Sequence, residues 1–372
     1  VGLIGTGGRA QQLMDHLPAA GQIVAASDCE LARIPESHRG ATLTPYQDYR
    51  RMLDAEKLDA VIVATPDHGR VLPCIHACQA GLDIYAEKPL TLTIGEGRVL
   101  VRAARKYQRV VQVGSQQRTM EMNRFACEFV RQGGIGQLKM VLAMNYPGPQ
   151  DYTGLPEQPI PQGFDWDLWT GPAELWPYNQ QLHRGWMAWQ AYSGGEMTNW
   201  GAHGLDQVQW ALGASHTGPV EVSVDGAGRV AMRYASGVPV RLELEQGPHG
   251  GAIFVGTEGK IEINRNKFTT NPPDLIRDPP SPATAEIWEG PGWIARPHLQ
   301  NWLDSIKTRA TPNADVEIGH RSVTVCHLAG IVRRLRRTLH WDPQTETFRG
   351  DDEANTYLNR PRRKGYELPE SV

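Results

Sequence analysis

Short apolar runs separated by longer amphipathic segments recur along the first third of the chain. The runs occupy residues 1–4, 23–26, 60–64, 82–85 and 110–113. Because the segments between them are long enough for crossover helices, this pattern predicts a parallel, doubly wound α/β sheet with helices on both faces. Ligands of such sheets bind beyond the carboxyl ends of the strands. We therefore expect the chemistry of this region in the segments that follow the apolar runs.

The pattern changes beyond residue 118. Residues 136–146 alternate like a strand, and further short strands are predicted at residues 220–224, 229–234, 238–245, 252–256 and 260–264. Turn pairs such as Asp225-Gly226 separate them, which favours a mostly antiparallel sheet. Helices are predicted at residues 125–132, 199–212, 299–306 and 319–339. We expect two domains: residues 1–117 with the parallel sheet, and residues 118–372, an α/β domain with a mostly antiparallel open sheet and a C-terminal tail.

The first apolar run leads into a glycine motif. Gly5, Gly7 and Ala10 satisfy the pattern G-x-G-x-x-G/A, which allows a tight turn, close approach to a diphosphate and close helix packing. The N–H groups at the start of the next helix would face that diphosphate. Asp28 lies 21 residues after Gly7, where a carboxylate accepts hydrogen bonds from an adenosine ribose. The motif predicts a Rossmann domain that binds NAD, since Asp28 would repel the 2′-phosphate of NADP; a glycine-rich turn of another α/β fold is the alternative.

Two further segments follow apolar runs and are expected at the same edge of the sheet. Thr65, Pro66 and His68 come after the third run, and Glu87 and Lys88 come after the fourth. The full predicted cofactor site consists of Gly5, Gly7, Gly8, Arg9, Ala10, Asp28, Thr65, Pro66, His68, Glu87 and Lys88.

Lys88, Asn199 and His203 are the candidate catalytic residues. A lysine beside a cationic nicotinamide could hold a substrate hydroxyl or carry its proton. Asn199 and His203 are four residues apart in a predicted helix and so share one face, and histidine is a natural general base for an alcohol. The alternatives are an exposed loop lysine, an asparagine that only caps the helix, and a histidine bonded to Asp206.

A Pro- and Trp-rich stretch over residues 146–192 suggests a carbohydrate ligand. Aromatic faces suit the C–H face of a pyranose, and indole N–H groups can bond its hydroxyls. Aromatic packing within a loop or against a neighbouring subunit is the alternative. The predicted substrate contacts are Gln117, Arg118, Trp166, His183, Arg184, Asn199 and His203.

Composition and charge narrow the choice of function. A formal net charge of −3 over 372 residues gives no reason to expect nucleic acid or an anionic membrane as partner. The five cysteines lack disulfide-like spacing, so we expect a reducing compartment, the cytoplasm. The periplasm, which is oxidising, is the alternative if an export signal was removed. Cys74 and Cys78 are predicted to be small buried side chains of a helix rather than ligands, and no metal is expected.

Three segments together resemble the Gfo/Idh/MocA family of oxidoreductases. They are Gly5-Thr6-Gly7-Gly8-Arg9-Ala10, Ala86-Glu87-Lys88-Pro89, and Gly194-Gly195 followed by Asn199-Trp200-Gly201-Ala202-His203 and Asp206. The resemblance implies a Rossmann domain followed by an α/β domain whose open sheet often forms an oligomer interface, hence a homodimer or homotetramer. It also implies Lys88 and His203 as catalytic residues and a sugar or cyclitol as substrate. The family's dehydrogenases usually have Asp where this chain has Asn199, and an amide takes no proton at neutral pH.

Three functions are consistent with these features. The leading hypothesis is an NAD(H)-dependent oxidoreductase that acts on a secondary hydroxyl or keto group of a sugar. The second is an NAD-dependent glycoside hydrolase that works by transient oxidation, elimination, hydration and re-reduction with retained cofactor; Asn199 and the aromatic stretch favour it. The third is a nucleotide-dependent sensor or scaffold with a decayed site, against which the presence of Lys88 and His203 argues.

Overall fold

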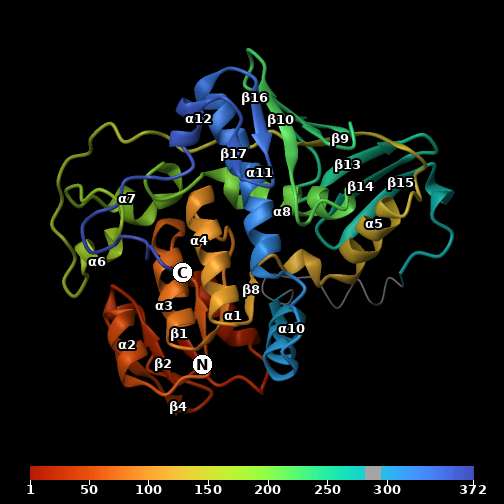
Figure 1. Ribbon diagram of the computed structural model, residues 1–372. Coiled ribbons are helices and arrows are strands. Elements are labelled where there is room, and N and C mark those ends of the chain that lie inside the picture. Colours follow the sequence, from red (N-terminus) through yellow and green to blue (C-terminus); the bar gives the residue numbers. More distant parts are fainter. Residues whose placement is uncertain (281–294) are drawn as a thin grey trace.

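Six parallel strands form the first sheet of the computed structural model, which describes residues 1–280 and 295–372 (Figure 1). The strand order is β5-β2-β1-β6-β7-β8, the doubly wound arrangement that the apolar runs predict. The strands are β1 (Gly2–Ile4), β2 (Ala25–Ser27), β5 (Thr44–Tyr46), β6 (Ala60–Val63), β7 (Asp83–Ala86) and β8 (Val111–Val113). The prediction missed β5, because this edge strand is short and mostly exposed and carries Pro45 at its centre.

Helices cover both faces of this sheet, and alternate residues of each strand point to the two sides. Leu3 and Ile62 face α1 (Gly8–His16) and α10 (Ala295–Thr308), where Trp302 is fully buried. Ile4 and Val63 face the other side, which is covered by α2 (Tyr49–Ala55), α3 (Val71–Gln79) and α4 (Ile94–Lys106). Helix α10 comes from the C-terminal part of the chain, so residues beyond 118 complete the core of the first sheet.

Nine strands form the second sheet, in the order β15-β14-β13-β9-β12-β11-β10-β16-β17. All pairs are antiparallel except β12 and β9, so the prediction of a mostly antiparallel sheet is confirmed. The strands are β9 (Leu138–Met144), β10 (Pro219–Val224), β11 (Val230–Tyr234), β12 (Pro239–Leu244), β13 (Ala252–Gly256), β14 (Lys260–Asn264), β15 (Lys267–Asn271), β16 (Leu339–Asp342) and β17 (Thr347–Phe348).

Three helices pack on one face of the nine-stranded sheet: α5 (Glu121–Arg131), α8 (Glu196–Ala211) and α11 (Val316–Leu335). The helix expected over residues 319–339 ends earlier than predicted. Arg336 adopts the left-handed conformation with φ 53°, which terminates α11, and Leu339 opens β16 instead. The position of α8 between the two sheets places Asn199 and His203 near the first domain.

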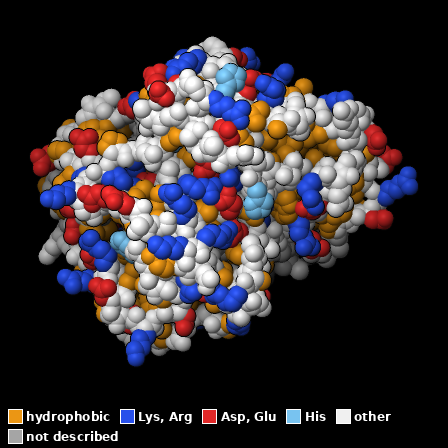
Figure 2. Space-filling view, in the orientation of Figure 1, with side chains coloured by type: hydrophobic (Ala, Val, Ile, Leu, Met, Phe, Trp, Pro, Cys, Tyr) orange, Lys and Arg blue, Asp and Glu red, His pale blue; other side chains and the backbone are white. Residues whose placement is uncertain are grey.

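The other face of the nine-stranded sheet carries a partly exposed apolar cluster. Ile253 pairs with Leu142 and Val255 pairs with Met140 across β13 and β9, and all four side chains are half-buried. Figure 2 shows hydrophobic side chains among charged ones on the side of the molecule where these strands lie. An oligomer built on this sheet stays a prediction. Among the described residues, no helix combines the length and apolar character that a membrane span requires.

Candidate active site

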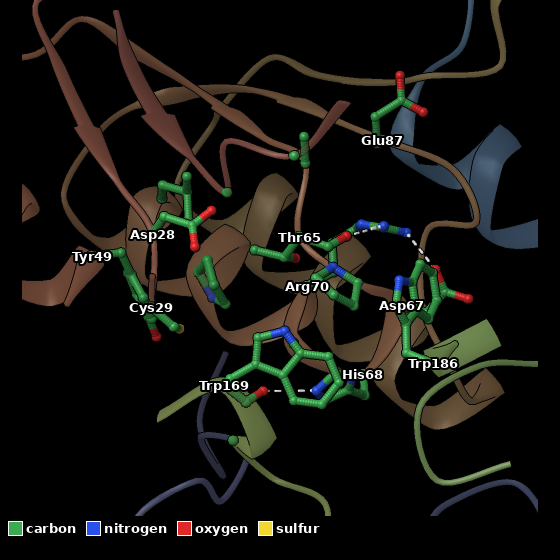
Figure 3. Close-up of a pocket in the computed structure, with 18 of the residues that line it drawn as sticks. Asp28, Cys29, Tyr49, Thr65, Asp67, His68, Arg70, Glu87, Trp169 and Trp186 are labelled. Carbon is green, nitrogen blue, oxygen red and sulfur yellow. Dashed lines mark hydrogen bonds and ion pairs between the residues drawn. The ribbon is translucent and has the colours of Figure 1, made fainter. Parts of the chain in front are cut away.

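A pocket of about 550 Å³ opens along the carboxyl ends of the parallel strands. Its walls come from the segments that follow β1, β2, β6 and β7, from residues 168–187, and from the C-terminal tail. Figure 3 shows Asp28, Cys29 and Tyr49 on one side and Asp67 and Trp186 on the other, with Trp169 between them. The predicted residues that line it are Gly5, Gly7, Gly8, Arg9, Asp28, Thr65, Pro66, His68, Glu87, Lys88, His183, Arg184 and Asn199.

The glycine loop has the geometry of a diphosphate cradle. Gly5 has φ +82°, and a Cβ there would lie 3.0 Å from the backbone of Ala64 and Thr65. A Cβ on Gly8 would meet nothing within 4 Å, so the start of α1 is open. No side chain caps α1, which leaves its first N–H groups available to a ligand. Ala10 does not line the pocket; it is fully buried against the sheet, where a larger side chain would separate helix and strand.

Asp28 is held rigidly at the side of this cradle. Its Oδ2 accepts hydrogen bonds from the backbone N and the Oγ1 of Thr6, both at 2.8 Å, and its Oδ1 accepts one from the N–H of Glu30 at 2.9 Å. Oδ2 thus uses both of its lone pairs, whereas Oδ1 accepts one hydrogen bond and can accept a second from a ribose hydroxyl. The pocket therefore fits a dinucleotide, and the contact of its adenosine ribose with Asp28 stays a prediction.

Arg9 and Glu87 form an ion pair at the opposite side of the glycine loop. Arg9 Nε lies 2.8 Å from Glu87 Oε1, and Glu87 is buried. Burial opposes ionisation of Glu87, but the charge and hydrogen bond of Arg9 hold the pKa of this carboxyl below its ordinary value. Glu87 is therefore an anion, and its Oε2 accepts a hydrogen bond from the N–H of Lys88 at 3.1 Å.

Lys88 and Asn199 meet between the two domains. Lys88 Nζ donates to Asn199 Oδ1 at 2.6 Å, and Asn199 Nδ2 donates to Glu196 Oε2 at 3.1 Å. Gly195, which precedes α8, has φ +67°, and a Cβ at this position would lie 2.7 Å from the backbone N of Pro149. Because glycine has no Cβ, α8 can begin at a place from which Asn199 reaches Lys88. Burial lowers the pKa of Lys88, partly offset by the charges of Glu87 and Asp67.

His203 lies one helical turn beyond Asn199 on α8. Its side chain is buried behind the pocket wall, which it does not itself line, and its ring centroid lies 5.8 Å from that of Trp200. Burial lowers the pKa of His203 well below its ordinary value, and the nearby charges of Lys88, Arg265 and Arg9 lower it further. The imidazole is therefore neutral at pH 7, which is the form that accepts a proton.

Arg265 is a site residue that sequence reasoning missed. It stands in the turn between β14 and β15, and its guanidinium lies 6.0 Å from the Trp200 ring. Nothing in its sequence context distinguishes it from a surface turn residue, because only the pairing of β14 and β15 brings this turn beside α8 and Lys88.

Asp206 does not support His203 as the sequence suggested. Arg118 Nε donates to both of its carboxylate oxygens, at 2.8 and 2.9 Å, and Ser322 Oγ donates to Oδ1 at 2.5 Å. Asp206 thus faces α11 rather than the pocket, and Arg118 is likewise a buried structural partner outside the pocket wall. Gln117 donates to the carbonyl of Gly250 at 2.7 Å and does not line the pocket either.

Most of the aromatic stretch packs on itself. Trp166 is 4% exposed, its indole N–H donates to the carbonyl of Trp176 at 2.8 Å, and it is not part of the pocket wall. Trp169 and Trp186 line the pocket instead. His68 joins this cluster to the first domain, because its Nε2 lies 2.8 Å from the carbonyl oxygen of Trp169. Burial lowers the pKa of His68 to about 3, so its imidazole is neutral.

His183 and Arg184 occupy the same wall. The His183 ring stacks on Phe164 with centroids 4.3 Å apart, and burial lowers its pKa to about 4. Arg184 pairs with Glu30 at 3.0 Å, which places it on the Asp28 side of the pocket rather than beside Lys88. Among residues 1–280 and 295–372, no cluster of three or more His, Cys, Asp or Glu side chains could hold a metal ion. Cys74 and Cys78 are buried in α3.

Arg70, Arg362 and Tyr366 also line the pocket without having been predicted. The guanidinium of Arg70 donates to the carbonyls of Thr65 and Pro89 and lies 3.5 Å from Asp67. It therefore ties the segment after β6 to the segment after β7. Arg362 and Tyr366 reach the pocket from the far end of the chain, so no local signal marks them.

Comparison with known proteins matches both parts of the chain to family models. Residues 1–115 match "Oxidoreductase family, NAD-binding Rossmann fold", and residues 149–368 match "Oxidoreductase family, C-terminal alpha/beta domain". The levoglucosan dehydrogenase of Pseudarthrobacter phenanthrenivorans is 26% identical over 71% of this chain and 73% of that protein. The rhizopine catabolism protein MocA of Rhizobium meliloti is 25% identical over 58% of each chain, so the match spans little more than half of that relative.

Solved structures share the fold. The WlbA dehydrogenase from Bordetella pertussis, solved in complex with NADH and UDP-GlcNAcA, superposes with a TM-score of 0.69 over 92% of this chain and 97% of that one, at 16% identity. The myo-inositol 2-dehydrogenase from Lactobacillus plantarum superposes with a TM-score of 0.63 over 91% and 98%, at 17% identity. With its NAD-binding Rossmann fold and its C-terminal α/β domain, the chain belongs to the Gfo/Idh/MocA family of oxidoreductases.

Proposed function

We propose that this protein is an NAD(H)-dependent oxidoreductase that acts on a secondary hydroxyl or keto group of a sugar or sugar derivative. The observation that carries this proposal is the contact of Lys88 with Asn199 at the end of the pocket away from Asp28, with His203 one turn further along α8. The named activities of two relatives, levoglucosan dehydrogenase and the scyllo-inositol 2-dehydrogenase of Bacillus subtilis, support a polyhydroxylated substrate.

The reaction requires a hydride acceptor, a group that holds the hydroxyl and a base. NAD, when bound, would supply the hydride acceptor. Lys88 Nζ donates to the side-chain oxygen of Asn199 at 2.6 Å and to its backbone carbonyl at 3.4 Å. Its third N–H donor is left for the substrate oxygen, whose developing charge it stabilises. His203 is neutral because it is buried among cations, so a ring nitrogen can accept the hydroxyl proton. Asn199 orients Lys88 and transfers no proton in the reaction.

Two variants test these roles. In Lys88→Ala and His203→Ala we expect kcat to fall by about 10²–10⁴ each, the usual contribution of a positioned acid or base. NAD affinity, measured by quenching of tryptophan fluorescence, should survive in both. Products from inositols, levoglucosan and free sugars are read by mass spectrometry, and an oxidised product is two mass units lighter (~2 Da). Arg241→Ala, on the exposed face of β12, is the matched control. Unchanged kcat in both site variants would refute the assignment.

A second candidate is a glycoside hydrolase that uses the same oxidation internally. The observation that favours it is the amide of Asn199 beside Lys88, in place of a carboxylate. Oxidation of one ring hydroxyl acidifies the neighbouring C–H; loss of that proton with the aglycone gives an enone, water adds, and return of the hydride restores the hydroxyl. A 2,7-anhydro-N-acetylneuraminate hydratase from Mediterraneibacter gnavus is 28% identical over 91 residues (24% of this chain). Its name denotes a hydration rather than glycoside cleavage, so it bears only on the water-addition step.

One experiment separates the candidates. Aryl glycosides and free sugars are incubated with the enzyme and NAD in heavy water, and the products are analysed by mass spectrometry. Accumulation of NADH with an oxidised sugar supports the dehydrogenase. A cleaved glycoside that carries carbon-bound deuterium, with NAD unchanged, supports the hydrolase. Nucleotide binding without turnover on any substrate would contradict both and leave the sensor or scaffold hypothesis.

A further inference from the structure

The end of the chain crosses back over the first domain. In Figure 1 the trace leaves α12 (Asp352–Thr356), passes α7 (Gln180–Arg184) and α6 (Trp166–Thr170), and ends beside α3. Leu368 and Val372 pack against the core beneath α3 and α4, and Lys106 Nζ donates to the carbonyl of Ser371 at 3.0 Å. Residues 360–372, here called the tail, are therefore docked on the domain rather than loose.

Glu96, at the start of α4, anchors the first part of the tail. Arg360 Nε donates to Glu96 Oε1 at 2.7 Å, and Arg362 Nη1 donates to the same oxygen. The carboxylate is 2% exposed, and Arg360 also donates to the carbonyl of His68 at 2.8 Å. Because one buried carboxylate serves two guanidinium groups, this junction carries an excess positive charge at the edge of the pocket.

Arg363 anchors the middle of the tail to α6. Its Nη1 donates to Asp167 Oδ2 at 2.8 Å, its Nε donates to the carbonyl of Gly171 at 2.8 Å, and its backbone N donates to that of Pro172 at 3.2 Å. The tail thus joins the segment 166–172, which itself lines the pocket through Trp169 and Gly171. Two segments that are distant in sequence close the same side of the pocket.

Arg362 and Tyr366 are the tail residues that face the pocket. The Arg362 side chain is 9% exposed; its Nε donates to the carbonyl of Tyr366 at 2.7 Å, while its Nη2 is buried without a hydrogen-bond partner in the described part of the chain. A buried guanidinium N–H without a partner costs free energy unless a ligand supplies an acceptor. An acceptor atom of a bound ligand would satisfy this N–H group.

Tyr366 lies at the Asp28 side of the pocket, and Arg362 is tied to it because its Nε donates to the Tyr366 carbonyl. Tyr366 packs with Tyr49 on the same core, and its ring comes within 3.9 Å of the position of a Cβ on Gly171. Tyr49 and Cys29, the neighbour of Asp28, line the same wall, and the carbonyl of Cys29 accepts the N–H of Asp165 at 2.9 Å, just before α6. Since Asp28 marks the adenosine ribose, the space beyond it is that of the base.

We propose that Arg362 and Tyr366 bind the adenine base of the dinucleotide, so that the C-terminal tail forms part of the cofactor site. Adenine offers a flat face and ring-nitrogen acceptors but no charge. The Tyr366 ring can stack on the flat face, and the Nη2 of Arg362 can donate to a ring nitrogen. The tail closes the adenosine end of the pocket, while the chemistry of Lys88 and His203 lies at the other end.

The test measures binding rather than turnover. Dissociation constants for NAD and for ADP-ribose, which lacks the nicotinamide, are measured by isothermal titration calorimetry on the full-length chain. For Arg362→Gln and Tyr366→Ala we expect each affinity to fall about tenfold or more, by the same factor for both ligands, since the contact lies in their shared part. Lys364→Ala, an exposed residue of the same tail, is the matched control and should bind both ligands as the wild type does.

Thermal unfolding of each unliganded variant shows whether it folds. If a variant does not, hydrogen exchange of the wild-type chain replaces it: ADP-ribose should slow exchange over residues 360–366. Unchanged affinities in folded variants, a loss for NAD without a loss for ADP-ribose, or unchanged exchange over residues 360–366 would each overturn the proposal. None of these outcomes depends on which sugar is the substrate.

Discussion

The Nζ of Lys88 lies 2.6 Å from the amide oxygen of Asn199, a contact that joins a loop of the first domain to a helix of the second across 111 residues of sequence. An amide oxygen accepts the ammonium hydrogen bond but brings no negative charge. Lys88 therefore keeps a pKa below its ordinary value, set first by burial, and its proton is less firmly held than it would be beside a carboxylate.

Asn199→Asp should change how the enzyme responds to alkaline pH. A carboxylate at this position favours the ammonium form and raises the pKa of Lys88, by about one unit for an adjacent opposite charge. If activity requires the ammonium, the alkaline limb of kcat/KM moves to higher pH by a similar amount. Glu196→Gln is the control, because Glu196 bonds the amide nitrogen rather than Lys88. An unmoved limb in Asn199→Asp would show that Lys88 does not act as the ammonium donor.

Arg265→Gln should change the acid side of the same profile. Burial and the charges of Lys88, Arg265 and Arg9 lower the pKa of His203, so activity that needs neutral imidazole is lost only well below pH ~6.5, the ordinary histidine value. Removing one cation makes the imidazolium easier to form and raises that pKa. The acid limb of kcat/KM should then move to higher pH, whereas Arg241→Gln, on an exposed strand face, should leave it in place. A shift to lower pH would contradict this assignment.

Asp28→Ser should weaken NAD and relax the discrimination against NADP. The substitution removes the acceptor for the ribose hydroxyls and the charge that repels a 2′-phosphate, while Arg33 remains on the same wall. Loss of charge-assisted hydrogen bonds of about 1.5–3 kcal/mol corresponds to roughly 10–100-fold weaker NAD binding. Calorimetric titration with both nucleotides measures the ratio. Equal affinity of the variant and the wild type for NAD would mean that Asp28 does not contact the ribose.

Asp206→Asn should destabilise the fold without altering the acid limb assigned to His203. The pair with Arg118 is buried on both sides, with side chains 4% and 2% exposed, and removal of one charge leaves the other uncompensated. Loss of one partner of such a pair costs about 3–5 kcal/mol of unfolding free energy, measured by urea denaturation. Asp225→Asn, in the exposed pair with Arg229, should change stability little. A shifted acid limb in Asp206→Asn would restore the link between Asp206 and His203.

The sequence predicted the features whose partners are close along the chain. Strand β1, the turn at Gly5, helix α1 and Asp28 occupy fewer than thirty residues, and their order alone predicts the nucleotide cradle. The spacing of Asn199 and His203 placed them on one helix face for the same reason. Strand β5 was not predicted, because its three residues at the edge of the sheet have no apolar pattern.

Local sequence by itself thus determined the parallel sheet, the cofactor loop and the presence of a lysine and a histidine suited to alcohol chemistry. Tertiary structure decided which groups surround them. It paired Asp206 with Arg118, buried Trp166 in the aromatic cluster, and brought Arg265 beside Trp200 and Arg362 to the wall of the pocket. Backbone periodicity and turn preference act over a few residues. The contacts of Arg118 with Asp206 and of Arg265 with Trp200 instead join residues more than sixty positions apart, and no local pattern encodes the packing that brings them together.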